Sequence, residues 1–141
     1  EKGGSKAFSA GTYDASDSLS STDSDGIGWI LKGVKAFGET TTAKASPSGR
    51  PDVDYFKLID SPTSTDLASG QKYKVTVAKE AWDGSDNGKL IDFFKVLKGT
   101  SSTTNVADSN NEFTADGSDY FLQIVGEGGE DAQYSVVLDI V

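Results

Sequence analysis

The chain has 141 residues, of which 22 are acidic and 13 basic, and it contains no Cys, His or Met. A net charge of -9 opposes binding to nucleic acid or to an anionic membrane surface. Because Cys and His are absent, disulfides, thiolate nucleophiles, Ser-His-Asp triads and ordinary zinc sites are excluded. A bound metal would be a hard cation held by oxygen atoms, calcium before magnesium.

The chain length is that of one domain with its own hydrophobic core. We expect a polar N-terminal arm over residues 1–26 and a single folded domain over residues 27–141. No apolar run approaches the roughly 20 residues that span a bilayer, so insertion into a membrane is not expected. The chain begins at Glu1 without a basic-then-apolar leader, as a mature secreted protein does and as a piece cut from a longer protein also would. We expect a secreted or extracellular location.

Apolar residues fall into short runs, beginning with a possible short strand at 6–13, "KAFSAGTY". The run 28–39, "GWILKGVKAFGE", predicts one strand, or two short strands bent at Gly33. Residues 40–52 follow with the composition of a flexible loop. The next run, 53–60 or "VDYFKLID", is apolar on both faces and predicts a central strand of a two-layer structure.

Four strand-like runs follow in the rest of the chain. Residues 71–79, "QKYKVTVAK", alternate apolar and polar positions, which predicts a half-buried strand with a lysine-bearing outer face. Residues 89–98, "KLIDFFKVLK", and 119–126, "DYFLQIVG", are apolar on both faces and predict two more central strands. Residues 133–141, "QYSVVLDIV", alternate again. The residues on their apolar face are Tyr134, Val136, Leu138 and Ile140.

Turn signals rich in Gly, Asp, Asn and Ser separate these runs. They cover residues 61–71, 82–89, 99–111, 115–119 and 126–131. No segment shows a sustained apolar stripe of helical period with capping residues. Several short strands joined by such turns predict an all-β sandwich or barrel.

Three segments share a pattern of strands and turns known from one family. They are "PDVDYFKLI" (51–59), "LASGQKYKVTV" (67–77) and "ADGSDYFLQIVGEGGEDAQYSVVLDIV" (115–141). The first two match an Asp-x-Asp-Tyr/Trp-Phe strand that precedes a glycine turn and an amphipathic strand. The third matches a pair of final strands around a glycine-rich turn. From about Gly28 to the C-terminus, the chain therefore resembles the bacterial pre-peptidase C-terminal domain family.

This resemblance implies an all-β fold, an antiparallel, jelly-roll-like β-sandwich. Members of the family are mostly non-catalytic domains of secreted and surface proteins; some bind calcium, and a few bind collagen or polysaccharide. Two segments depart from the family's pattern, the more aromatic strand at 89–100 and the long insertion at 40–52.

The stretch "DGSDNG" carries the strongest metal signal in the chain. Asp83, Ser85, Asn87 and Gly88 fall at positions 1, 3, 5 and 6 of a calcium-binding loop, where side-chain oxygens surround the ion and glycine permits the tight turn. Position 12 is Phe94 instead of the Glu that completes such a loop. The alternative interpretation is a polar hairpin connection that needs no metal.

Further carboxylates could complete a calcium site or form another one. Asp86 and Asp92 could approach the same ion from other directions, while Asp23 and Asp25 precede Gly26 as half a loop of their own. The alternative for the second pair is a solvated polar arm. The candidate metal ligands are Asp23, Asp25, Asp83, Ser85, Asp86, Asn87 and Asp92.

Other polar and aromatic residues offer weaker signals. Asp52 and Asp54 stand at the start of a predicted strand and suit a metal site or a turn cap equally well. Carboxylate pairs could indicate a glycosidase, but 22 acidic residues make such pairs unavoidable, so no catalytic residue is named. Trp82 borders a polar loop and is the candidate for stacking against a sugar ring.

Two functions follow from these observations. The first is a non-catalytic extracellular structural protein, a cell-surface or filament subunit that associates with copies of itself through an edge strand or its N-terminal arm, with calcium as a possible stabilising ion. The second is an accessory binding module of a secreted hydrolase, which holds polysaccharide or a protein fibre. Neither function involves nucleic acid or insertion into a membrane.

Overall fold

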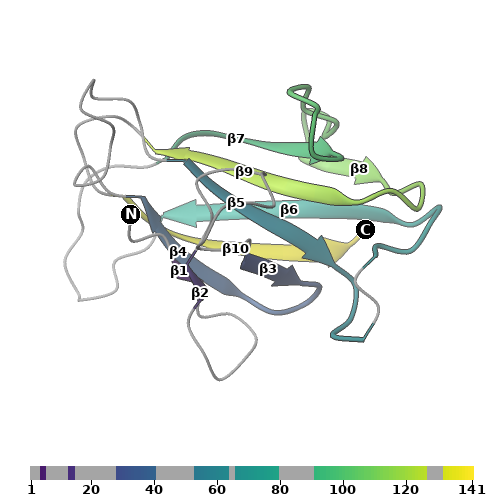
Figure 1. Cartoon of the computed structure of the whole chain (residues 1–141), viewed down its shortest axis with the longest axis horizontal. Helices are drawn as coiled ribbons and strands as arrows, with labels where there is room; N and C mark the ends of the chain where they lie inside the picture. Colours follow the sequence, from purple (N-terminus) through teal and green to yellow (C-terminus); the bar gives the residue numbers. More distant parts are fainter. Residues whose placement is uncertain are drawn as a thin grey trace.

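The protein is a sandwich of two β-sheets (Figure 1). In this computed structural model the described residues are 4–5, 13–14, 28–40, 53–63, 66–79, 91–126 and 132–141. Their strands are β1 (Gly4–Ser5), β2 (Tyr13–Asp14), β3 (Gly28–Leu31), β4 (Ala36–Thr40), β5 (Val53–Ile59), β6 (Lys72–Lys79), β7 (Ile91–Lys98), β8 (Glu112–Thr114), β9 (Tyr120–Gly126) and β10 (Ala132–Ile140). No helix long and apolar enough to cross a membrane occurs within these ranges.

Odd- and even-numbered strands separate into the two layers. One four-stranded sheet has the order β4-β10-β6-β8, here the even-strand sheet, and the other has the order β3-β5-β9-β7, here the odd-strand sheet. Every connection from β3 to β10 therefore crosses from one layer to the other, which is the jelly-roll-like arrangement expected from the sequence. All pairs are antiparallel except β3 with β5, which is parallel.

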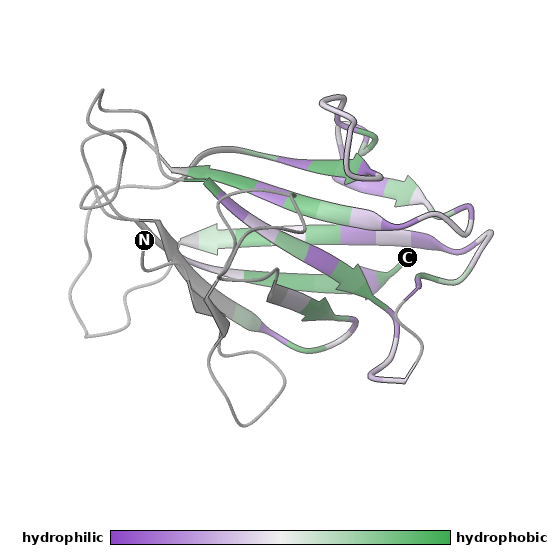
Figure 2. Ribbon diagram, in the orientation of Figure 1, coloured by the Kyte–Doolittle hydropathy of each residue, from purple (hydrophilic) through white to green (hydrophobic). Residues whose placement is uncertain are grey.

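The core lies between the sheets and consists of the inward residues of every strand from β3 to β10. Alternation along the strands produces it, because successive side chains point to opposite faces. Hydrophobic residues gather on the strands, while hydrophilic residues fill the turns beside the C-terminus (Figure 2). The largest fully buried side chains are Tyr73, Tyr134, Phe56, Ile30, Leu58, Ile59, Leu97, Leu122, Ile124 and Leu138.

Several strand predictions are confirmed. The run 28–39 forms two short strands, β3 and β4, in different sheets, and the turn between them passes through Gly33 with φ of 79°. A positive φ there is accessible to glycine at little cost. The apolar runs at 53–60 and 119–126 are the two central strands of the odd-strand sheet, β5 and β9.

Two expectations about individual strands need correction, and one strand was missed. The run 89–98 was expected to be central, but β7 is the edge strand of the odd-strand sheet. Ile140 was expected on a buried face, but it lies at the end of β10 and is 50% exposed. The short strand β8 was not predicted, because three residues are too few to show an alternating pattern.

The N-terminal arm includes a small sheet of its own. β1 pairs with β2, matching Gly4 with Asp14 and Ser5 with Tyr13. β1 lies beside β3 and β4, and β2 lies beside β3 (Figure 1). The other residues of the predicted strand at 6–13 lie outside the described residues, and pairing of the arm with a second copy stays a prediction.

Candidate functional site

Most of the predicted site residues lie outside the part of the chain that the structure describes. These are Asp23, Asp25, Asp52, Trp82, Asp83, Ser85, Asp86 and Asn87. Asp92 belongs to strand β7, at an irregularity of the ladder between Ile91 and Phe93. The predicted calcium site and sugar-stacking tryptophan therefore stay predictions.

The described turns at one end of the sandwich are held by tyrosine–aspartate–lysine contacts. At the start of the β5–β6 connection, the Tyr73 hydroxyl donates to Asp60 Oδ1 at 2.8 Å and accepts from the Ala68 backbone N–H at 2.8 Å. The Lys32 ammonium lies 3.2 Å from the same carboxylate oxygen. Burial, together with the neighbouring Asp60 carboxylate, raises the pKa of Tyr73 to about 12, so the hydroxyl stays protonated.

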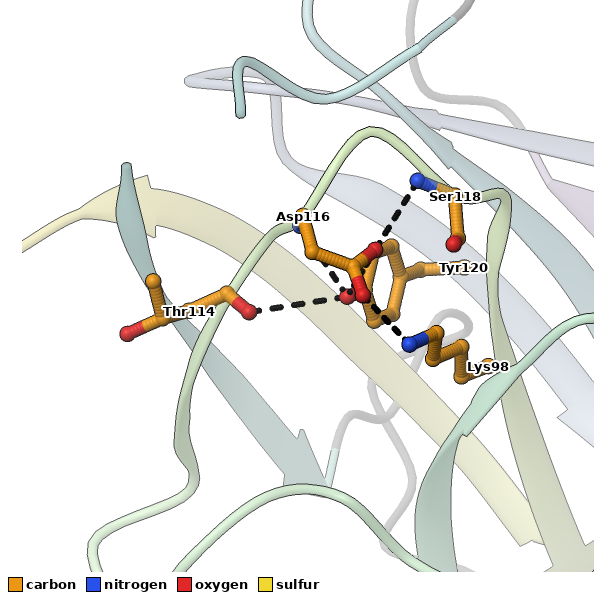
Figure 3. A network of polar contacts seen from close by, with 5 residues as sticks. All are labelled: Lys98, Thr114, Asp116, Ser118 and Tyr120. Atoms are coloured by element: carbon orange, nitrogen blue, oxygen red, sulfur yellow. Dashed lines mark hydrogen bonds and ion pairs between the residues drawn. The ribbon is translucent and has the colours of Figure 1, made fainter. Parts of the chain in front are cut away.

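A second set of the same kind holds the turn between β8 and β9 (Figure 3). Asp116 accepts from the Ser118 backbone N–H at 3.0 Å and from the Tyr120 hydroxyl at 3.1 Å, and it forms an ion pair with Lys98. The turn passes through Gly117 with φ of 93°, a conformation that other L-residues rarely adopt. This is an aspartate-capped turn anchored by a core tyrosine.

Asp116 should stay ionised well below the pH at which an ordinary aspartate is protonated. Lys98 first, and then Ser118 and Tyr120, hold the pKa of this carboxyl well below its usual range. Because the folded-state pKa is the lower one, the stabilisation is complete above the unfolded value of about 4 and is lost as the pH falls toward the folded value. An NMR titration of the Asp116 carboxyl carbon measures this directly.

The control for this titration is Lys98→Met. This variant should raise the titration midpoint of Asp116 toward about 4, the pKa of a model aspartate. Raising the salt concentration should move it in the same direction, because the two side chains are 47% and 48% exposed. A midpoint near the model value in the native protein would show that the contact with Lys98 is not maintained in solution.

Two further carboxylates of this end have hydrogen-bond or ion-pair partners within the chain. Asp108 accepts from the backbone N–H groups of Asn110 and Glu112, while Glu112 lies 3.1 Å from Lys72. No group of three or more acidic residues that could hold a metal ion occurs among the residues described.

Asp54, for which the sequence suited a metal site or a turn cap, is a buried residue of strand β5 and does not cap a turn. Its side chain points into the core and is fully buried, and the Tyr134 hydroxyl of the opposite sheet donates to it. A buried carboxylate of this kind connects the two sheets. Its role is internal, and we do not count it among candidate ligand-binding residues.

The outer face of the odd-strand sheet is the best candidate for a binding surface. The register places Tyr55, Gln123 and Lys95 opposite one another on β5, β9 and β7. Gln123 Nε2 donates to the Tyr55 hydroxyl at 2.8 Å. These three residues, here the polar row, are half-buried, and Trp29 on the adjoining strand β3 is half-buried as well.

Apolar side chains flank the polar row on the same face. Phe121 and Val125 stand two residues on either side of Gln123 and are only 5% and 6% exposed. Leu97 is 2% exposed beside Phe121 in the register. On this face Phe121, Val125 and Leu97 are buried, while the three residues of the polar row are half-buried.

The charges on this face are two lysines, each with a partner. Lys57 Nζ lies 3.2 Å from Asp119 and 3.9 Å from Asp66, and Lys95 Nζ donates to the Thr103 carbonyl oxygen at 3.4 Å. Along strands β3, β5, β7 and β9, the described outward positions carry no carboxylate. The face thus combines aromatic rings, uncharged hydrogen-bonding groups and two lysines, of which Lys57 forms ion pairs.

Sequence reasoning missed this surface. The signal was present, because runs apolar on both faces require a cover or a partner on each face. What the sequence did not show is which outward residues of β5, β9 and β7 would align, since the register depends on pairing between distant segments.

Comparison with known proteins adds little to this geometry. The chain matches no family model and no curated protein. Among solved structures it is similar to PliG of Salmonella Typhimurium, a periplasmic inhibitor of g-type lysozyme. The two are 14% identical with a TM-score of 0.43, over 81% of this chain and 99% of PliG. A likeness at this level carries no argument about function.

Proposed function

We propose that the chain is a non-catalytic binding module of a secreted protein, and that it recognises an uncharged polysaccharide along the polar row of the odd-strand sheet. The observation that carries this proposal is the alignment of Tyr55, Gln123 and Lys95 across three adjacent strands at the accessible part of that face. Such a function corresponds to the second of the two sequence-based hypotheses, with a different binding residue.

The chemistry of the polar row suits a sugar chain. An aromatic ring covers the apolar C–H face of a pyranose, and amide, hydroxyl and ammonium groups bond to its hydroxyls. As Tyr55 accepts a hydrogen bond from Gln123, its own O–H proton can be donated to a ligand. The strands form a rigid support, which lowers the entropic cost of binding.

Replacing Tyr55 by Ala should weaken polysaccharide binding by about tenfold or more, since truncating a central aromatic contact typically costs at least about 2 kcal/mol. Affinity electrophoresis against xylan, mixed-linkage glucan and soluble chitin derivatives measures this. Tyr55→Phe keeps the ring and should retain most of the affinity. Thr76→Ala, on the exposed face of the even-strand sheet, is the matched surface control and should bind as the native chain does.

Other results of the same experiment would redirect the proposal. If Trp82→Ala abolishes binding while Tyr55→Ala does not, the site includes the sugar-stacking tryptophan predicted from the sequence and not the polar row. Repeating the assay with calcium and with a chelator tests whether the predicted ligands around Asp83 contribute. Binding to alginate or pectin alone would replace an uncharged ligand by an anionic one, and no binding to any glycan would refute the proposal.

Self-association as a surface or filament subunit stays an alternative hypothesis. Three of the four edge strands offer little room for it: β3, β4 and β8 have 4, 5 and 3 residues. Sedimentation velocity of the native chain tests this function separately from glycan binding.

A further inference from the structure

The long edge strand of the sandwich is β7, with 8 residues at the side of the odd-strand sheet. An open edge of this length presents unpaired N–H and C=O groups that can pair with another chain. Strand β7 is not open along its middle, because the β7–β8 connection folds back against it. This connection, residues 99–111, is here the edge loop.

Two residues of the edge loop form hydrogen bonds with the backbone of Val96. The Val96 N–H donates to Asn105 Oδ1 at 3.0 Å, and the Val96 carbonyl accepts from the Val106 N–H at 2.9 Å. The Asn105 side chain thus takes the place of a neighbouring strand's carbonyl group, and Val106 supplies the donor. Both groups of Val96 that point away from β9 are satisfied within the chain.

The loop is itself held in shape on either side of this contact. Asn105 Oδ1 also accepts from the Ala107 N–H at 3.1 Å, which bends the loop around the amide. Further along, Asp108 Oδ1 accepts from Asn110 and Glu112 and fixes the return into β8. On the outer face, Lys95 Nζ donates to the Thr103 carbonyl at 3.4 Å.

We propose that the edge loop, held to β7 by Asn105, prevents β7 from pairing with β7 of a second copy of this chain. This inference is independent of the glycan-binding function. Its physical basis is that a strand edge with its central N–H and C=O groups already bonded offers a partner no ladder to extend.

A second copy is the partner that this edge fits. In an antiparallel pair centred on Val96, Val96 of each chain exchanges both hydrogen bonds with its counterpart, which is the self-complementary arrangement of a twofold dimer. Lys95 then stands opposite Leu97, and Lys98 opposite Phe94, so no lysine meets a lysine. The two odd-strand sheets would become one continuous sheet.

The test is the oligomeric state and the amide exchange of Asn105→Ala. Sedimentation velocity should show a concentration-dependent dimer for this variant and a monomer for the native chain. In dilute solution the Val96 amide should exchange about tenfold faster or more than in the native chain, because it has lost its acceptor. As the dimer forms, the same amide should become protected again.

Two variants serve as controls. Asn105→Asp keeps an acceptor oxygen for Val96 and should stay monomeric. Asn110→Ala removes an asparagine side chain from the same loop but leaves the backbone that Asp108 caps, and it should also stay monomeric.

Three results would overturn the proposal: a folded Asn105→Ala that stays monomeric at high concentration, dimers formed equally by all three variants, or a native Val96 amide that exchanges as fast as one in an unfolded chain. The last measurement needs no variant, so it decides the question even if Asn105→Ala does not fold.

Discussion

Replacing Phe113 by Ala should lower the free energy of unfolding by about 3–5 kcal/mol, the range found when a large core aromatic is truncated. Phe113 is the single inward residue of β8 and lies in the main core. Its ring centroid is 5.9 Å from that of Tyr73 on the same sheet and 5.0 Å from that of Tyr120 on the opposite sheet. The Phe113 side chain therefore contacts both sheets near the turn between β8 and β9.

The expected loss is large because the truncation affects more than packing. Tyr73 and Tyr120 orient the hydroxyls that hold Asp60 and Asp116, and the cavity left by Phe113 would loosen both rings. Urea unfolding followed by tryptophan fluorescence gives the free energy. Thr114→Ala, an exposed neighbour on β8, is the control and should cost less than about 1 kcal/mol. Equal losses for the two variants would contradict the central position of Phe113.

The second large effect is expected at the buried contact between the sheets. Tyr134→Phe should destabilise the protein by about 2–3 kcal/mol, because it removes a hydroxyl donor from a fully buried carboxylate that cannot turn to water instead. Asp54 and Tyr134 are 0% and 1% exposed. The bond joins β5 of one layer to β10 of the other.

Tyr73→Phe is the matched control for this variant. It also deletes a hydroxyl that donates to an aspartate, but the Asp60 side chain is 26% exposed and has Lys32 beside it, so the expected cost is about 1 kcal/mol. A double-mutant cycle with Asp54→Asn should show coupling between Asp54 and Tyr134. If Tyr134→Phe and Tyr73→Phe lower the free energy of unfolding by the same amount, the burial of Asp54 does not explain the loss in Tyr134→Phe.

The two regions differ in how far they could be predicted. The aromatic content of "EFT" did not mark β8, since a strand of 3 residues depends on its neighbour β6 for its existence. From the sequence, Asp54 suited a metal site or a turn cap equally well. Its partner Tyr134 is 80 residues away, and only packing of the two sheets brings them together.

The sequence by itself determined the all-strand architecture and the positions of the long strands, and it offered Gly33 as the place of a bend between two short strands. The reason is that these depend on local properties: alternation of apolar residues with period two, and glycine where φ is positive. Composition likewise excluded thiol, imidazole and disulfide chemistry, because those require atoms that the chain does not contain.

The tertiary structure alone decided which strand is an edge, which outward residues align as the polar row, and which carboxylates are occupied. Strand β7 has the apolar composition of a central strand, yet it lies at the side of its sheet under the edge loop. Sheet order and register arise from pairing between segments far apart in the chain, and no local pattern encodes them, because the same alternating strand fits several neighbours.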